Sequence, residues 1–154
     1  MATEAAKAAQ HFCNTTAASN VNTQYVIALP SKTPPPGFGY YCAYHSSVHS
    51  ATLGDVAYTN LPYQNDLGSL CWQGAVNSPG TDGVSIVEGT EFIDTITDMD
   101  PPTGWVDANR QEAAAKCAGA GPMGDITTAT GTFAVRSIWS NQANGGAGAC
   151  VMSG

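Results

Sequence analysis

The chain has 154 residues, of which 43% are hydrophobic, and this is enough for one domain with a buried core. Five Lys and Arg residues against twelve Asp and Glu residues give a net charge of −7. Nucleic acids and anionic membrane surfaces require a basic face, so this balance argues against both as partners. The low share of charged residues, 11%, and the seventeen glycines are typical of a secreted protein with many turns. No apolar run reaches the roughly 18 residues of a membrane-spanning helix. The first residues lack a signal-peptide pattern, so we expect a mature form or a fragment.

The five cysteines, at positions 13, 42, 71, 117 and 150, indicate an oxidising compartment. None lies in a Cys-x-x-Cys pair, so a structural zinc knot is not expected. Two disulfides and one odd thiol are the simplest account. The count leaves the connectivity open, and we favour Cys42–Cys71 and Cys117–Cys150 because each bond then bridges one local half of the chain. Cys13 is left over and is expected to be a buried free thiol.

The first half of the chain predicts one helix and three strands. Strong helix formers run over Ala2–Phe12, with apolar residues on one face. The β-rich run Tyr25–Leu29 ends at a proline and predicts a buried strand. A loop follows at Pro34–Gly37, with no sign of a domain boundary. Further strands are expected at Tyr40–His45 and Val56–Tyr63.

The second half alternates loops with helices and strands. Residues 65–81 are rich in loop formers, and Asp82–Asp98 predicts a helix that ends before two prolines. A shorter helix is expected at Asn109–Cys117, and one or two strands at Ile126–Trp139. A glycine turn at Asn144–Gly148 leads to the last cysteine. Helices and strands do not alternate regularly, so we expect one α+β domain over residues 1–154.

The helix predicted at Asp82–Asp98 has an apolar arc and an acidic arc. The apolar arc is expected to face the core and carries Ile86, Phe92, Ile93 and Ile96. The opposite arc carries Glu88, Glu91, Asp94 and Asp98. Two interpretations stay open for the acidic arc. It is a solvated face, or it binds a cation, since it contains no Lys or Arg to offset the repulsion between like charges.

The same helix carries a motif by which the chain resembles a known group of proteins. Its sequence, DGVSIVEGTEFIDTITD, is similar to the helix DGVSIVEGHEYAETITD of secreted actinobacterial and fungal proteins. That group is similar in turn to the plant EXORDIUM (phosphate-induced protein) family, which has a GHELAE motif. Further matches in the same order lie at residues 11–20, 42–45, 56–63, 105–117 and 130–150. The chain resembles the C-terminal half of longer members, so a further N-terminal region is expected.

The resemblance implies a zincin-like core, with a mixed or antiparallel sheet and one central motif-bearing helix. The family pattern His-Glu-x-x-Glu is similar to the zincin helix, in which His binds zinc and the first Glu polarises a metal-bound water. Carried over to this chain, the resemblance makes Glu91 the catalytic general base. It makes His45, Asp94 and Glu112 the candidate metal ligands.

Two departures from the family motif argue against a tight zinc site. Thr90 stands where the motif has its His, and Ala115 stands where it has an Asp. Asp94 keeps the charge of the family's Glu but has a shorter reach. What remains fits a loose, oxygen-rich site for zinc or calcium. The resemblance therefore implies a secreted metallopeptidase-like domain with a degenerate metal motif and weak or absent hydrolytic activity.

Aromatic residues raise an alternative, an extracellular carbohydrate- or cell-wall-binding protein. Aromatic rings stack on sugar faces, and Tyr40, Tyr41, Tyr63 and Trp72 are the candidate binding residues. The other interpretation is that these rings anchor the core and the turns. The ligand would be a peptide for the metallopeptidase-like domain and a glycan for the alternative.

Overall fold

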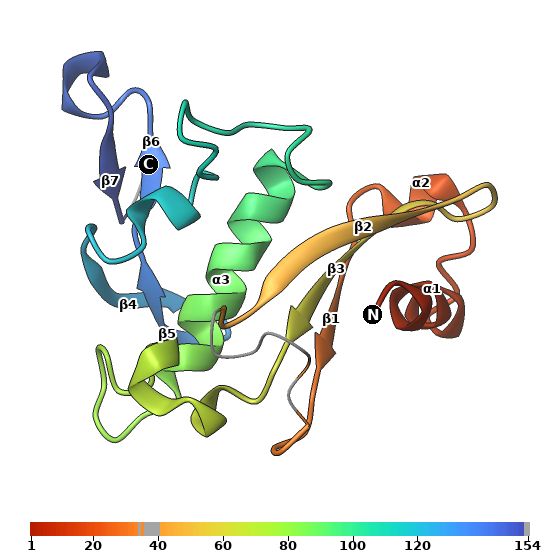
Figure 1. The fold of residues 1–154 in the computed structure, drawn as a ribbon, viewed down its shortest axis with the longest axis horizontal. Helices are drawn as coiled ribbons and strands as arrows, with labels where there is room; N and C mark the ends of the chain where they lie inside the picture. Colours follow the sequence, from red (N-terminus) through yellow and green to blue (C-terminus); the bar gives the residue numbers. More distant parts are fainter. Residues whose placement is uncertain (34, 36–40, 153–154) are drawn as a thin grey trace.

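The computed structural model describes residues 1–33, 35 and 41–152, and it confirms the α+β class (Figure 1). The α-helices are α1 (Ala2–His11), α2 (Ala17–Asn20) and α3 (Asp82–Thr97). The strands are β1 (Gln24–Ala28), β2 (Tyr44–Ser50), β3 (Gly54–Leu61), β4 (Met123–Thr128), β5 (Gly131–Arg136), β6 (Ile138–Ser140) and β7 (Ala149–Val151). Short 3-10 turns lie at Gln64–Asp66, Gly68–Cys71, Ala115–Cys117 and Asn144–Gly146.

The main sheet has three strands in the order β1-β3-β2, with β1 parallel and β2 antiparallel to β3. The central strand β3 is buried on both faces from Val56 to Leu61, because helices pack on either side of the sheet. Val56 and Tyr58 belong to the core cluster of α1, whereas Leu61 packs with Val87 of α3. Alternate residues of β3 therefore point to different helices, and those at Thr59 and Leu61 share the α3 side.

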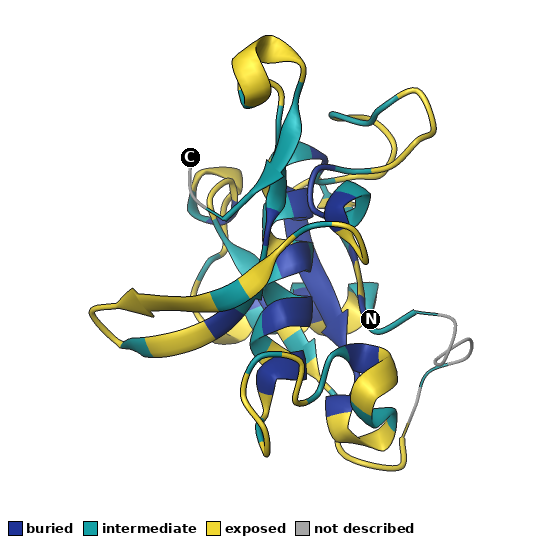
Figure 2. Ribbon diagram, turned by 90° about the vertical axis from the view of Figure 1, so that its left-hand side faces the viewer, coloured by how far each residue is buried: buried dark blue, intermediate teal, exposed yellow. Residues whose placement is uncertain are grey.

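Two small antiparallel hairpins, β4–β5 and β6–β7, lie on the other side of α3 from the main sheet (Figure 1). The hydroxyl of Ser85 on α3 donates a hydrogen bond of 2.7 Å to the carbonyl of Ala134 on β5. α3 is thus held between the sheet and the hairpins, and Figure 2 shows buried positions gathered on this helix and the neighbouring sheet. Among the described residues, no helix is long and apolar enough to cross a membrane.

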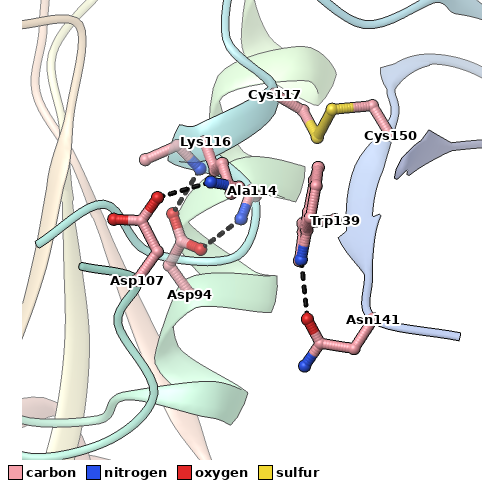
Figure 3. The surroundings of a disulfide bond; sticks show 9 residues. Asp94, Asp107, Ala114, Lys116, Cys117, Trp139, Asn141 and Cys150 are labelled. Carbon is pink, nitrogen blue, oxygen red and sulfur yellow. Dashed lines mark hydrogen bonds and ion pairs between the residues drawn. A yellow bond between two sulfur atoms is a disulfide. The ribbon is translucent and has the colours of Figure 1, made fainter. Parts of the chain in front are cut away.

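Both predicted disulfides, Cys42–Cys71 and Cys117–Cys150, are confirmed. The second one ties the turn at Ala115–Cys117 to β7 (Figure 3). The two disulfides are consistent with an extracellular or otherwise oxidising location. The prediction for Cys13 is half wrong, because this thiol is free but exposed. Cys13 follows the end of α1 with a left-handed φ of 61°, beyond the helix face that packs through Ala5 and Ala9.

Several predicted elements match the structure closely, and two do not. The helices at Ala2–Phe12 and Asp82–Asp98 each end one residue early, and the strand at Tyr25–Leu29 is shifted by one residue. The strand predicted at Tyr40–His45 instead begins at Tyr44 and runs on to Ser50. Tyr40 and most of the predicted loop at Pro34–Gly37 lie outside the described residues.

The helix predicted at Asn109–Cys117 is reduced to the 3-10 turn Ala115–Cys117. A carboxylate captures backbone amides that a longer helix would use. The Asp94 carboxylate accepts the N–H groups of Ala114 and Ala115, at 2.6 and 3.1 Å, which in a helix from Asn109 would bond to the carbonyls of Arg110 and Gln111. Such side-chain bonds compete with the helical ladder, so the segment folds as a loop around its acidic acceptors.

Candidate functional site

The faces of α3 are buried in the opposite sense to the prediction. Of the apolar arc only Ile86 is fully buried, whereas Phe92 and Ile96 are 49% and 64% exposed. On the acidic arc Asp94 and Asp98 are 2% and 1% exposed. The acidic arc is therefore not a solvated face. The acidic arc faces the side of the sheet that carries His45 and Thr59. Buried carboxylates are unfavourable unless they have hydrogen-bond or charged partners.

His45 is the first of these partners. It lies on β2 opposite Thr59 of β3, on the side of the sheet that faces α3, and its side chain is only 3% exposed. Its Nδ1 lies 3.1 Å from Oε2 of Glu91 on α3. The strand and the helix thus bring together two residues that are 46 positions apart in the sequence.

The other ring nitrogen of His45 also faces oxygen atoms. Nε2 lies 2.9 Å from the backbone carbonyl of Asp98 and 3.2 Å from Oε1 of Glu112. Both nitrogens can satisfy such acceptors only as N–H donors, so the ring is an imidazolium. Burial alone would lower the pKa of His45, but the bonds to Glu91 and Asp98 and the charges of Glu112 and Glu91 raise it to about 9.

Asp94 is fixed by backbone amides rather than by His45. Its two carboxylate oxygens accept the N–H groups of Ala114 and Ala115, at 2.6 and 3.1 Å (Figure 3). These bonds anchor the loop before Cys117 to the last turn of α3. Both oxygens are thereby engaged, and Asp94 acts in this structure as a bracket for the loop that carries Glu112.

Arg136, the last residue of β5, brings a second positive charge into the cluster. Its Nε–H donates to the Thr90 hydroxyl at 2.7 Å, and that hydroxyl donates to the Ile86 carbonyl at 2.7 Å. The guanidinium carbon lies 5.1 Å from the centroid of the Trp72 ring, within the range of a cation–π contact. Burial lowers the pKa of Arg136, while the charges of Asp94 and Glu91 favour its charged form.

Three carboxyl groups around His45, those of Glu88, Asp94 and Glu112, have raised pKa values. Burial raises the pKa of Glu112 to about 7, and the neighbouring carboxylates add to this effect against the charge of His45. Burial and the charge of Glu91 raise the pKa of Glu88 to about 7. Burial likewise raises the pKa of Asp94 to about 6, although its two amide bonds oppose the shift. The site therefore contains groups that exchange protons near neutral pH.

An open cavity of about 550 Å³ contains most of the predicted site. Glu91, His45, Asp94 and Glu112 all line it, together with Thr90 and Arg136. Of the predicted aromatic residues, Tyr41 and Trp72 line the cavity as well. Tyr63 is 45% exposed but is not among the lining residues, and Tyr40 lies outside the described residues.

The residues present do not fit a zinc ion. Both nitrogens of His45 already face oxygen acceptors, both oxygens of Asp94 accept amides, and the guanidinium of Arg136 lies beside Thr90. A cation placed there would meet the positive charges of His45 and Arg136. Across residues 1–33, 35 and 41–152, no group of three or more His, Cys, Asp and Glu side chains is arranged to hold a metal ion.

Sequence reasoning missed Arg136 and the role of the Asp98 carbonyl. A signal for Arg136 was present, because it lies two residues after Ala134 in a predicted strand and so shares its face. Ala134 is 4% exposed and packs toward α3, which places Arg136 on the buried side. The Asp98 carbonyl could not be inferred, since it depends on where α3 ends relative to β2.

No protein-family model matches this chain, and neither a curated protein nor a solved structure matches it. The likeness to the EXORDIUM family rests on the motifs alone and stays an expectation.

Proposed function

We propose that the protein is a secreted, metallopeptidase-like domain whose metal motif is degenerate, with weak or absent hydrolytic activity. The observation that carries the proposal is the convergence of His45, Glu91, Asp94 and Glu112 in one cavity. They come from β2, from α3 and from the loop before Cys117. A zincin-like origin of this core, with α3 as the motif-bearing helix, is part of the same proposal.

The residues around these four side chains support weak or absent hydrolytic activity. Thr90 has no ring nitrogen to offer, and its hydroxyl is engaged by both Arg136 and the Ile86 carbonyl. Ala115 provides a backbone N–H to Asp94 and no ligand side chain. The charges of Arg136 and His45 balance the carboxylates in the place of a metal ion. One carboxylate oxygen of Glu91, the predicted general base, is paired with the ring of His45 at 3.1 Å.

Zinc titration by calorimetry tests the proposal, with casein hydrolysis as the second readout. The parent protein should bind zinc no more tightly than the high-micromolar range, on the order of an acidic surface, and should not digest casein. Thr90→His alone should change little, since the guanidinium of Arg136 stays beside the new ring. Thr90→His combined with Arg136→Gln should bind zinc at least about tenfold more tightly, because a ligand is added and a charge is removed.

A matched control separates this local effect from a change in net charge. Arg110 is exposed, so Arg110→Gln removes the same formal charge at the protein surface. Combined with Thr90→His, it should leave zinc affinity unchanged. Tight zinc binding or casein digestion by the parent protein would overturn the proposal.

A carbohydrate- or cell-wall-binding protein is the second candidate. It is favoured by the aromatic residues along the cavity, where Tyr41 and Trp72 are joined by Tyr44. The rings of Tyr41 and Tyr44 meet edge to face at 5.7 Å, and Trp72 already lies against Arg136. Titration with chitotriose, followed by tryptophan fluorescence, tests this candidate directly. Saturable quenching that Trp72→Ala abolishes would support it over the peptide ligand.

A further inference from the structure

An apolar pocket lies next to the candidate cavity, on the hairpin side of α3. Its volume is about 240 Å³. Most of its lining is aliphatic and comes from α3 and the two hairpins: Ile86, Ile93, Ile126, Val135, Ile138 and Val151. Phe92 and Ile126, which are 49% and 38% exposed, leave apolar surface at this pocket open to solvent.

Thr90 and Arg136 line both the pocket and the candidate cavity. The pocket and the cavity therefore adjoin each other at these two residues. Pockets that enclose whole small-molecule ligands usually measure about 300–1,000 Å³. A space of about 240 Å³ instead suits a single side chain of a larger ligand.

The chemistry of the lining distinguishes between the two ligand classes considered above. A sugar ring would need hydrogen-bond partners for its hydroxyl groups, since an unpaired buried hydroxyl is unfavourable. The side chains here with oxygen or nitrogen atoms are those of Thr90 and Arg136, and the Nε–H of Arg136 already donates to the Thr90 hydroxyl. Nη1 of Arg136 has no partner among the described residues, but a guanidinium only donates and gives the hydroxyl protons of a sugar no acceptor. An aliphatic side chain needs no such partners and gains free energy from burial.

We propose that this pocket receives one aliphatic side chain of a peptide whose backbone lies along the candidate cavity. The inference rests on the proposed function insofar as it takes the cavity as the peptide site. It goes further in naming the ligand class, a polypeptide with a bulky aliphatic residue, and the residues that select it. The pocket then provides specificity, whereas the charged cavity holds polar backbone groups.

Gly89 provides a way to close the pocket without disturbing its walls. It lies on α3 and lines the pocket, and a Cβ added there would meet nothing within 4 Å outside the backbone of its own helix. Gly89→Leu therefore fills the space that the ligand side chain would occupy. Gly89→Ala is the matched control, because it makes the same backbone change and leaves most of the volume free.

The test is a titration of isotope-labelled protein, followed by the backbone amide signals of Gly89 and Ile126. One probe is a blocked pentapeptide with leucine between four alanines, and a second replaces that leucine with serine. The leucine peptide should give saturable shifts, and the serine peptide should bind at least about tenfold more weakly, as the burial of a leucine side chain implies. Gly89→Leu should weaken the leucine peptide at least about tenfold, and Gly89→Ala less than about twofold.

Equal binding of the two peptides, undiminished binding to Gly89→Leu, or no saturable shift with either peptide would overturn the proposal. Saturable shifts of these two amides with chitotriose would overturn it as well. If Gly89→Leu does not fold, Ile126→Thr takes its place, since it removes apolar surface from a partly exposed wall and should weaken the leucine peptide several-fold. Failure of the proposed function would be seen separately, as tight zinc binding or casein digestion by the parent protein.

Discussion

The Nε–H of Arg136 donates to the Thr90 hydroxyl at 2.7 Å, and this bond joins the last residue of β5 to the middle of α3. It places a guanidinium beside a helix whose buried face carries carboxylates. Since unpaired buried charges are strongly unfavourable, the carboxylates of that face need partners. Backbone N–H groups hold Asp94 and Asp98, and the positive charges of His45 and Arg136 add to this. The cluster is thus balanced by charges that belong to the chain itself.

The bracket formed by Asp94 should be important for stability. Asp94→Ala leaves the buried N–H groups of Ala114 and Ala115 without an acceptor. We expect a loss of about 2–5 kcal/mol in the free energy of unfolding, measured by urea denaturation. Asp94→Asn retains one acceptor oxygen and should lose less. Asp100 is exposed, and Asp100→Ala should stay within about 0.5 kcal/mol of the parent. Equal effects of the variants at 94 and 100 would contradict the bracket.

Stability should fall as the pH rises from neutral to alkaline. The folded-state pKa of His45 is raised to about 9 from an ordinary value of 6.5, so the folded protein binds this proton more tightly than the unfolded chain. Its contribution is complete below about pH 6.5 and is lost as the pH rises through about 9. Between pH 7 and pH 9 the loss should be on the order of 2 kcal/mol.

The control for this pH effect is His45→Gln, which cannot carry the proton. Urea denaturation at pH 7 and pH 9 should show a smaller loss of stability for this variant than for the parent. Glu88 and Glu112, whose pKa values are raised to about 7, act with the same sign but mainly between about pH 4.5 and pH 7. A parent protein equally stable at pH 7 and pH 9 would show that His45 is not held as an imidazolium.

The two sides of α3 should differ in their tolerance of substitution. Ile86 is 1% exposed, so Ile86→Ala should lose about 2–5 kcal/mol of unfolding free energy. Ile96, which is 64% exposed, should lose less than about 1 kcal/mol on the same change. Thermal denaturation of the two variants measures the contrast. Similar losses at both positions would mean that a further surface covers Ile96.

The Cys13 thiol should react without unfolding. Because it is exposed while the other four cysteines are bonded, a maleimide should label one site per native chain. Mass spectrometry should locate that label on Cys13, and Cys13→Ser should abolish it. Full reduction in denaturant should raise the count to five. Labelling only after denaturation would show that Cys13 is buried, as the sequence predicted.

The helices and strands of this chain were easier to predict than which face of α3 is buried. Local patterns were sufficient to predict α1, β1 and α3, because helix and strand propensities and stop signals depend on residues that are neighbours in the sequence. The burial of Asp94 and Asp98 could not be deduced from their spacing. It depends on partners such as the N–H groups of Ala114 and Ala115, which lie 20 and 21 residues from Asp94 in the sequence. Hydrophobicity favoured Phe92 and Ile96 as core residues, but long-range electrostatic pairing outweighed it.

The candidate site was predictable in part for the same reason. The motif resemblance named His45, Glu91, Asp94 and Glu112, and the structure brings all four to one cavity. Their proposed roles remain predictions. Arg136, which changes the chemistry of the site, lies 46 residues from Thr90, and its contact depends on how the β4–β5 hairpin packs against α3.

Elemental analysis of the purified protein tests the central claim most directly, namely that the cluster is balanced by Arg136 and His45 instead of a metal ion. The protein would be produced in zinc-supplemented medium, dialysed against metal-free buffer and analysed for zinc and calcium. We expect far less than one equivalent of either metal per chain. One equivalent of zinc retained after dialysis, and lost in a His45→Gln variant, would contradict the account.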